Sequence, residues 1–419
     1  MMQTVRGVHD ILPDEVAIWQ FLEAKALTIF GLYGFTEIRS PLFEKTELFA
    51  RAVGATTDIV EKEMYTFADR GGDSLSLRPE GTASVVRSFV QQSLHRQLPW
   101  KVWYRGPMFR YERPQKGRQR QFHQIGCELF GPVGPLADAE LMAMVMHYLG
   151  DMGLQAALVL EINSLGCLAC RTPYRALLIA ALRQAAAHLC EDCNHRMERN
   201  PLRVLDCKRE TCRATVTAAP IMLDHLCLGC RDHFYQLKGH LEALGVPYVV
   251  NPRMVRGLDY YNRTAFEVTS VGLGAQNAVA AGGRYDGLVE QMGGTSTPAI
   301  GFAMGMERLV LLLDRQKIPA RGMDVYLATL GASAENAGLV LAETLRRGGI
   351  SVELNLGGGS LKSQMKRADR AQVRFTVMIG DTEIEKRSVI IKDMVAGVQQ
   401  EVAWSEVTDH LVNRLRTGS

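Results

Sequence analysis

The sequence lacks long hydrophobic runs, since its purely apolar stretches, such as Leu309–Leu313, span only a few residues. A membrane-spanning helix needs about 20 consecutive apolar residues, so no membrane span or membrane partner is expected. Residues 1–15 contain no apolar core of the kind found in a secretory signal peptide, and we therefore expect a cytoplasmic protein. An excess of one charge is missing too, because 48 basic and 45 acidic residues leave a net charge of only +3. This balance excludes a protein that coats nucleic acid through overall charge, so any such contact must come from local patches.

Two common nucleotide-binding loops are also missing, namely the dinucleotide-binding G-x-G-x-x-G and the Walker-type G-x-x-x-x-G-K-S/T. Internal repeats and low-complexity tracts are not found either. What is present is a chain of 419 residues, 47% of them hydrophobic, which is enough for two or three domains with real cores. A polar segment at 314–322 reads as a linker, and strands alternate with helices in 323–419. That alternation predicts a small C-terminal α/β domain with a mixed sheet.

The stretch 101–131 predicts two strands joined by a basic loop, with aromatic and β-branched residues on both sides. Arg110 is expected just inside the first strand, a rigid position from which its planar guanidinium can hold a phosphate. Gln124 and Glu128 lie four residues apart on the return strand, so both should point to one face. A hairpin with a solvated basic tip is the alternative. The basic residues of the loop are Arg113, Lys116, Arg118 and Arg120.

The residues Phe109–Glu112 (F-R-Y-E) and the following RPQKGRQRQFHQIGCE resemble motif 2 of class II aminoacyl-tRNA synthetases, in the form found in the histidyl-tRNA synthetase family. A helical pattern at 15–33 and a strand-like segment at 35–49 with Pro41 are similar to motif 1, which forms the dimer interface in that class. The segment 298–313 resembles motif 3. Further matches to the histidyl family are RPEGT at 78–82, RGLDYY at 256–261 and GGRYD at 282–286.

The resemblance implies an α+β fold. We expect a class II catalytic domain at 1–322, with an antiparallel sheet flanked by helices and a mostly helical, cysteine-rich insertion at 164–245. An anticodon-binding domain is expected at 323–419. The implied activity is that of a histidine–tRNA ligase, which joins L-histidine and ATP, with Mg²⁺, into histidyl-adenylate and pyrophosphate. Histidine then passes to the 3′-terminal ribose of tRNA(His). The resemblance also implies a homodimer.

The resemblance further implies roles for individual residues. Arg110 and Arg256 are expected at the α-phosphate, where charge develops in the transition state. A neutral imidazole offers one donor and one acceptor, so Glu128 as acceptor and Tyr261 as donor suit its recognition. The histidine-binding residues are expected to be Glu80, Thr82, Gln124, Glu128, Tyr260, Tyr261 and Tyr285. The ATP-binding residues are expected to be Arg110, Glu112, Arg118, Phe122 and Arg308. The residues beside the acceptor end of the tRNA are expected to be Gln115, Lys116 and Arg120.

Eight of the nine cysteines fall between 167 and 230, in four pairs. The C-x-x-C spacing of three pairs allows two thiolates to reach one tetrahedral ion, and a structural zinc site is the leading interpretation. Iron–sulfur ligation, a redox role and free thiols that pack as small apolar residues are the alternatives. The spacing leaves open which pairs share a metal and whether His188, His195, His225 or His233 competes as a ligand. The four pairs are Cys167/Cys170, Cys190/Cys193, Cys207/Cys212 and Cys227/Cys230.

Two other functions compete with the ligase. Paralogues of this family act as regulatory subunits of a histidine-biosynthetic phosphoribosyltransferase, but they usually lack the anticodon domain and have degraded substrate motifs. Here Arg110, Arg256, Arg308 and the C-terminal domain are all present. A metal-dependent RNA-binding or redox module would explain the cysteine pairs and nothing else in the chain.

Overall fold

The computed structural model describes residues 2–54, 57–115, 117–207, 209–314 and 322–416. The chain divides into two compact units, Met1–Ile318 and Pro319–Ser419. In the described residues no helix is both long and apolar enough to cross a membrane.

An eight-stranded sheet forms the centre of the first unit. All its neighbouring strands run antiparallel except the two outermost pairs, β1 with β5 and β8 with β7, which are parallel. The antiparallel sheet expected from the resemblance is thus confirmed. In spatial order the strands are β1 (Thr36–Glu37), β5 (Trp100–Phe109), β6 (Gln121–Phe130), β11 (Ala299–Gly305), β10 (Ala278–Arg284), β9 (Asn262–Ser270), β7 (Leu158–Ser164) and β8 (Val249–Val250).

The predicted hairpin is formed by β5 and β6, which pair from Trp100 with Phe130 to Phe109 with Gln121. Arg110 follows the last residue of β5 instead of lying inside the strand. Its backbone N–H still donates to the carbonyl of Arg120 at 2.9 Å, so the ladder holds Arg110 in place.

Helices cover both faces of this sheet. One face carries α1 (Pro13–Leu32), α4 (Pro135–Asp151), α8 (Leu228–Ala243) and α10 (Met306–Leu312), whose apolar side chains share one core with β6, β9 and β11. The other face carries α2 (Thr46–Val53), α3 (Thr82–Gln91) and α9 (Leu288–Gln291). A small antiparallel sheet lies beside α2, with β4 (Ser74–Leu77) between β2 (Phe43–Lys45) and β3 (Thr66–Ala68). The strand predicted across 46–49 was wrong, because these residues begin α2 and bury Leu48 and Phe49.

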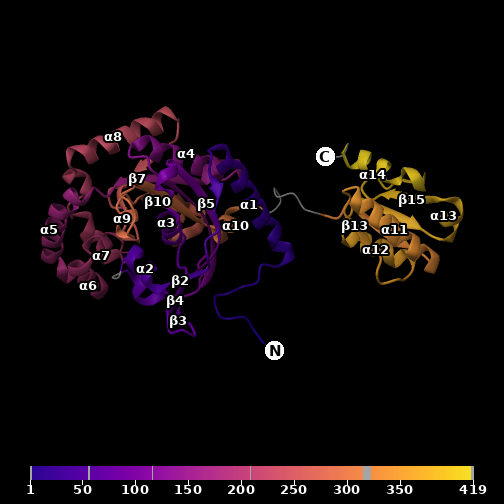
Figure 1. The fold of residues 1–419 in the computed structure, drawn as a ribbon, viewed down its shortest axis with the longest axis horizontal. Coiled ribbons are helices and arrows are strands. Elements are labelled where there is room, and N and C mark those ends of the chain that lie inside the picture. The colour runs from indigo at the N-terminus through magenta and orange to yellow at the C-terminus, as the bar shows by residue number, and fades with distance from the viewer. Residues whose placement is uncertain (1, 55–56, 116, 208, 315–321, 417–419) are drawn as a thin grey trace. The chain divides into compact units, whose positions relative to one another are not determined.

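The insertion is mostly helical, as predicted, and its helices α5, α6 and α7 gather at one end of the first unit (Figure 1). They have a small core of their own in which four cysteines are buried. The bounds are α5 (Leu168–Gln184), α6 (Glu191–Arg199) and α7 (Glu210–Thr217).

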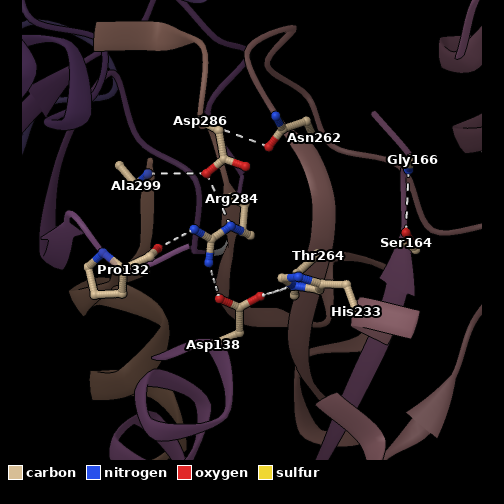
Figure 2. Close-up of polar contacts among 10 residues, drawn as sticks. All are labelled: Pro132, Asp138, Ser164, Gly166, His233, Asn262, Thr264, Arg284, Asp286 and Ala299. Carbon is tan, nitrogen blue, oxygen red and sulfur yellow. Dashed lines mark hydrogen bonds and ion pairs between the residues drawn. The ribbon is translucent and has the colours of Figure 1, made fainter. Parts of the chain in front are cut away.

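A buried polar network ties helix α8 to the large sheet (Figure 2). The Asp138 carboxylate on α4 accepts from the Arg284 guanidinium at 2.5 Å and from the Thr264 hydroxyl at 2.5 Å, and lies 2.8 Å from Nε2 of His233 on α8. Asp138 and Arg284 are fully buried, so each charge is balanced inside the protein. His233 therefore serves this network and is not a ligand beside the cysteines.

The second unit is a five-stranded mixed sheet with helices on it, as predicted. The first three strands in spatial order are parallel and the others antiparallel. The short helix α13 and the edge strand β16 were not predicted, because their sequences DTEIEK and QQEVA are polar and carry little periodicity. In spatial order the strands are β13 (Val352–Leu354), β12 (Val325–Thr329), β14 (Phe375–Ile379), β15 (Ser388–Asp393) and β16 (Gln399–Ala403). The helices are α11 (Ala332–Arg347), α12 (Leu361–Arg370), α13 (Asp381–Lys386) and α14 (Val407–Arg416).

Candidate active site

A cavity of about 510 Å³ opens over the middle of the large sheet. Its floor is made of small residues on β10 and β11, among them Ala281, Ala303 and Gly305, which leave room for a flat ligand. The structure brings together here most of the residues that the sequence predicted for substrate binding. Those that line the cavity are Glu80, Thr82, Arg110, Glu112, Arg118, Phe122, Gln124, Arg256, Tyr260, Tyr261 and Arg308.

Five arginines line this cavity and make it suited to a polyanion: Arg110, Arg118, Arg196, Arg256 and Arg308. Arg110 lies over the ring of Phe122 at 5.2 Å and donates through Nε to the carbonyl of Pro79 at 2.8 Å. Arg118 pairs with Glu112 at 2.6 Å. Burial, and then the neighbouring Arg118, lower the pKa of Arg308, which means that its positive charge is poorly compensated by the protein. A bound anion would supply that compensation.

Arg256 also lines the cavity, and it lies on the segment between β8 and β9, far from Arg110 in the sequence. Its guanidinium lies 3.7 Å from the Glu267 carboxylate and 5.7 Å from the centre of the Tyr261 ring. Its Nε is buried and has no hydrogen-bond partner among the described residues. The residue is thus oriented by Tyr261 and Glu267 but still has a donor to offer.

Glu128 lies behind the cavity and does not line it. Its Oε1 accepts from the Thr82 hydroxyl at 2.7 Å, and its Oε2 accepts from the Tyr285 hydroxyl at 2.5 Å. Burial is the main cause that raises the pKa of Glu128 to about 8, against the lowering effect of the Tyr285 and Thr82 hydroxyls. Tyr285 is likewise buried behind the cavity wall. Glu128 therefore contacts the cavity wall through Thr82, and Tyr285 holds Glu128 from behind.

Glu80 caps helix α3. Its two carboxylate oxygens accept from the backbone N–H groups of Thr82 and Ala83, each at 2.8 Å. Burial raises the pKa of Glu80, while these two donors lower it. A cap and a ligand for an ammonium group are compatible here, because each carboxylate oxygen has a second lone pair and Glu80 lines the cavity.

Unpartnered polar atoms mark the same cavity. Among the described residues, Oε1 of Gln119, Oε1 of Gln124, Nε of Arg256 and the Tyr260 hydroxyl are buried and have no hydrogen-bond partner. All four residues line the cavity. Since a buried polar group without a partner costs about 1–3 kcal/mol, their convergence indicates a polar ligand that satisfies them.

The loop between β5 and β6 holds the three residues predicted for the tRNA acceptor end. Gln115 and Arg118 exchange two backbone hydrogen bonds, at 3.0 and 2.9 Å, which close the loop tip. Arg120 stacks on Tyr111 at 3.9 Å and does not line the cavity. Lys116 lies outside the described residues.

Several cavity residues were not predicted. Gln119 lies within motif 2 between two arginines, just before β6, and strand alternation would have placed it on the face opposite Phe122 and Gln124. Glu267 on β9 and Glu307 on α10 carry no local signal. Asp206 and Cys207 come from the insertion, and only the tertiary structure brings them to the cavity.

An antiparallel sheet that carries an arginine-bearing hairpin, with a glycine-rich strand running into an arginine-bearing helix beside it, is the catalytic domain of a class II aminoacyl-tRNA synthetase. The comparisons with known proteins make the assignment narrower. The model of the histidyl-tRNA synthetase family matches residues 7–309, and the model of an anticodon-binding domain matches residues 324–414. The chain belongs to the histidyl-tRNA synthetase family.

Curated relatives match along almost the whole chain. The histidine–tRNA ligase of Geobacter sulfurreducens is 53% identical over 403 residues, which cover 96% of this chain and 97% of the relative. The histidine–tRNA ligase of Desulforamulus reducens is 51% identical over 406 residues, with the same coverage. At this identity over nearly the full length, the activity of this chain is that of a histidine–tRNA ligase.

Solved structures agree with this fold. The apo histidyl-tRNA synthetase of S. aureus is 36% identical, with a TM-score of 0.83 over 98% of this chain and 100% of that one. A protein from Bacillus halodurans C, described as an ATP phosphoribosyltransferase regulatory subunit/histidyl-tRNA synthetase, has a TM-score of 0.66 at 21% identity over 91% of this chain and 98% of that one. That second likeness concerns the fold alone.

Proposed function

We propose that the cavity over the large sheet forms histidyl-adenylate, and that Arg110 and Arg256 are its catalytic residues. The carboxylate of histidine attacks the α-phosphorus of ATP in line, one P–O bond forms, and pyrophosphate leaves with the electrons of the bond that breaks. Negative charge on the phosphoryl oxygens increases in the transition state, so fixed positive charge lowers the barrier. The unpartnered Nε of Arg256, buried at the cavity, is the observation that carries this proposal.

Histidine is proposed to lie at the end of the cavity formed by Thr82, Tyr260 and Tyr261. Glu80, Thr82 and the unpartnered oxygen of Gln124 are proposed to bind the α-ammonium group. For the imidazole, Tyr261 acts as donor and Glu128 as acceptor. The Thr82 hydroxyl has to release Oε1 of Glu128 for this contact, while Tyr285 keeps the other oxygen in place. A site of this kind rejects apolar side chains, because its own polar groups would remain unpaired.

ATP is proposed to bind as its Mg²⁺ complex against Arg118 and Arg308. Phe122 beneath Arg110 offers a flat face to the adenine, and Glu112 orients Arg118 through their 2.6 Å contact. Mg²⁺ would neutralise the outer phosphates, and the leaving pyrophosphate with them. The poorly compensated charge of Arg308 supports this placement.

Transfer to tRNA(His) is proposed to use the loop between β5 and β6, where Gln115, Lys116 and Arg120 would lie beside the acceptor end. The second unit is proposed to bind the anticodon.

We further propose a homodimer. The small sheet exposes Phe43 on β2 and Phe67 on β3, whose ring centres lie 6.4 Å apart. Phe43 is 52% exposed and Phe67 is 45% exposed. Phe43 lies on the segment similar to motif 1, and an exposed aromatic pair is the kind of surface that a partner covers. Sedimentation of the purified protein tests this, and a monomer at micromolar concentration would contradict it.

Structural Zn²⁺ is proposed in the insertion, outside catalysis. The eight cysteines form two groups, and within each group the sulfurs lie within 4.8 Å of one another. We name the group Cys167, Cys170, Cys227 and Cys230 the root cluster, and the group Cys190, Cys193, Cys207 and Cys212 the wall cluster. In the root cluster, Sγ of Cys167 lies 3.7 Å from Sγ of Cys170 and 3.8 Å from Sγ of Cys227. Four sulfurs at about 2.3 Å from a tetrahedral zinc ion are about 3.8 Å apart, so the residues fit this metal.

The catalytic role of Arg256 is tested by Arg256→Ala in ATP–pyrophosphate exchange with histidine. Loss of a charge-stabilising donor predicts a fall in kcat of about 10²–10³-fold. Arg256→Lys keeps the charge without the planar fork and should recover only part of it. The exposed pair of Arg183 with Glu198 offers a matched control, because Arg183→Ala removes an arginine that does not line the cavity. A change in the KM for histidine with kcat unaltered would refute a transition-state role.

A further inference from the structure

The wall cluster adjoins the active-site cavity. Cys207 itself lines the cavity, together with its neighbour Asp206 and with Arg256. The other cysteines anchor Cys207 in the core of the insertion, where Cys193 and Cys212 are fully buried and Sγ of Cys212 lies 3.2 Å from the backbone nitrogen of Cys190. The cluster thus joins three segments of chain at the edge of the cavity: the start of α6, the end of segment 200–207 and the start of α7.

Segment 200–207 contacts the stretch of chain that carries residues proposed for catalysis and for histidine binding. The Asn200 amide donates to the Asp259 carboxylate at 2.8 Å. The Arg203 guanidinium lies 3.1 Å from the position that a Cβ on Gly257 would take, and Val255 packs against the core of the insertion. These contacts all fall on segment 255–261, which contains Arg256, Tyr260 and Tyr261.

Segment 255–261 has little structure of its own to fix it. Its residues, all described, form neither helix nor strand between β8 and β9. Its position therefore depends on side-chain contacts, and one flank of those contacts belongs to the insertion. A displacement of about 1 Å at such a site is enough to cost about 10²-fold in rate.

We infer that the metal of the wall cluster is a positioning element for the active site, because it fixes segment 200–207 and through it Arg256, Tyr260 and Tyr261. This inference rests on the proposed zinc sites. The root cluster has a different place, where the chain leaves β7 and returns in α8, with Cys167 and Cys227 at the starts of α5 and α8. Its metal closes the base of the insertion. The two sites thus differ in their structural role, although each is formed by four cysteines.

The test compares the full-length wild type with Cys190→Ser/Cys193→Ser and with Cys190→His. Metal analysis of the wild type should give two zinc ions per chain, the double serine variant should retain one, and Cys190→His should keep two because histidine also binds zinc. In pyrophosphate exchange, kcat/KM for histidine should fall on the order of 10²-fold in the double variant and recover to within about tenfold in Cys190→His. Amide hydrogen exchange at 255–261 should accelerate in the double variant and not in Cys190→His.

A second variant keeps the proposal testable if the double variant does not fold. Asn200→Ala leaves all eight cysteines in place, so it should keep two zinc ions, while exchange of the amides at 255–261 accelerates and kcat/KM falls. One zinc ion with unaltered kcat/KM in the double variant, or an Asn200→Ala variant that resembles the wild type, would overturn the positioning role and leave the zinc sites standing. A fully active wild type without bound metal would overturn the zinc sites themselves.

Discussion

The buried carboxyl group of Glu128 should make the stability of the catalytic unit depend on pH. Its pKa is raised to about 8 in the folded protein, from an ordinary value of 4.5, chiefly by burial. Between these two values the unfolded chain has released the proton that the folded chain still holds. The free energy of unfolding therefore falls as the pH rises through this interval, by up to about 1.4 kcal/mol per pH unit, or about 5 kcal/mol in total. Above pH 8 both states are ionised and the dependence ends.

Glu128→Gln removes this titration and keeps the shape of the side chain. The amide oxygen still accepts from one hydroxyl, and the amide NH₂ can donate to the oxygen of the other, Thr82 or Tyr285. The variant should therefore gain stability relative to the wild type as the pH rises from 5.5 to 8, by about 1.4 kcal/mol per unit, and the gain should level off above pH 8. Below pH 5 ionisation of Glu128 should contribute little to the difference in unfolding free energy between the two proteins.

Urea unfolding at several pH values measures the difference, with tryptophan fluorescence as the signal. Trp19, Trp100 and Trp103 all lie in the first unit, so the signal reports mainly on the fold around Glu128. Parallel curves of unfolding free energy against pH for the two proteins would refute a buried carboxyl group with a raised pKa at this position.

Three further predictions follow from single contacts. Tyr260→Phe removes a buried hydroxyl that has no partner among the described residues, so the protein without histidine should become more stable, by up to about 1–3 kcal/mol, while the KM for histidine rises in pyrophosphate exchange. Asp138→Asn removes one of the two carboxylates that pair with the buried Arg284 guanidinium, Asp286 being the other, and should cost about 1–3 kcal/mol, seen as a lower Tm; an unchanged Tm would contradict the buried pair. Gly301→Ala would place Cβ 1.6 Å from Oε2 of Glu128 and should abolish exchange with histidine, whereas Gly287→Ala meets nothing within 4 Å and should be neutral.

Much of the catalytic fold could be predicted from the sequence because its motifs are local. The hairpin around Arg110 and the cap of α3 at Glu80 are both encoded within a few residues, by β-formers on either side of a basic loop and by a carboxylate just before a helix. The even spacing of Gln124 and Glu128 placed both on one face of β6, although Gln124 lines the cavity and Glu128 lies behind it.

The features that could not be predicted depend on contacts between distant segments. Cys167 and Cys170 meet Cys227 and Cys230 because the chain leaves and re-enters the sheet at one place, and no spacing rule contains that information. His233 looked like a possible metal ligand in the sequence, but α8 turns it toward Asp138. The sequence predicts a strand over 46–49 because TELF contains β-formers, whereas these residues begin α2 and bury Leu48 and Phe49 in the core.

The most direct test of the central claim is ATP–pyrophosphate exchange by the purified protein, with each of the twenty amino acids in turn. Histidine should support exchange, and the others should not, because the cavity at Thr82, Gln124 and Tyr261 is built from polar groups that only an imidazole side chain is proposed to satisfy. Exchange with another amino acid at a comparable rate, or with none, would contradict the assignment of this cavity to histidine activation.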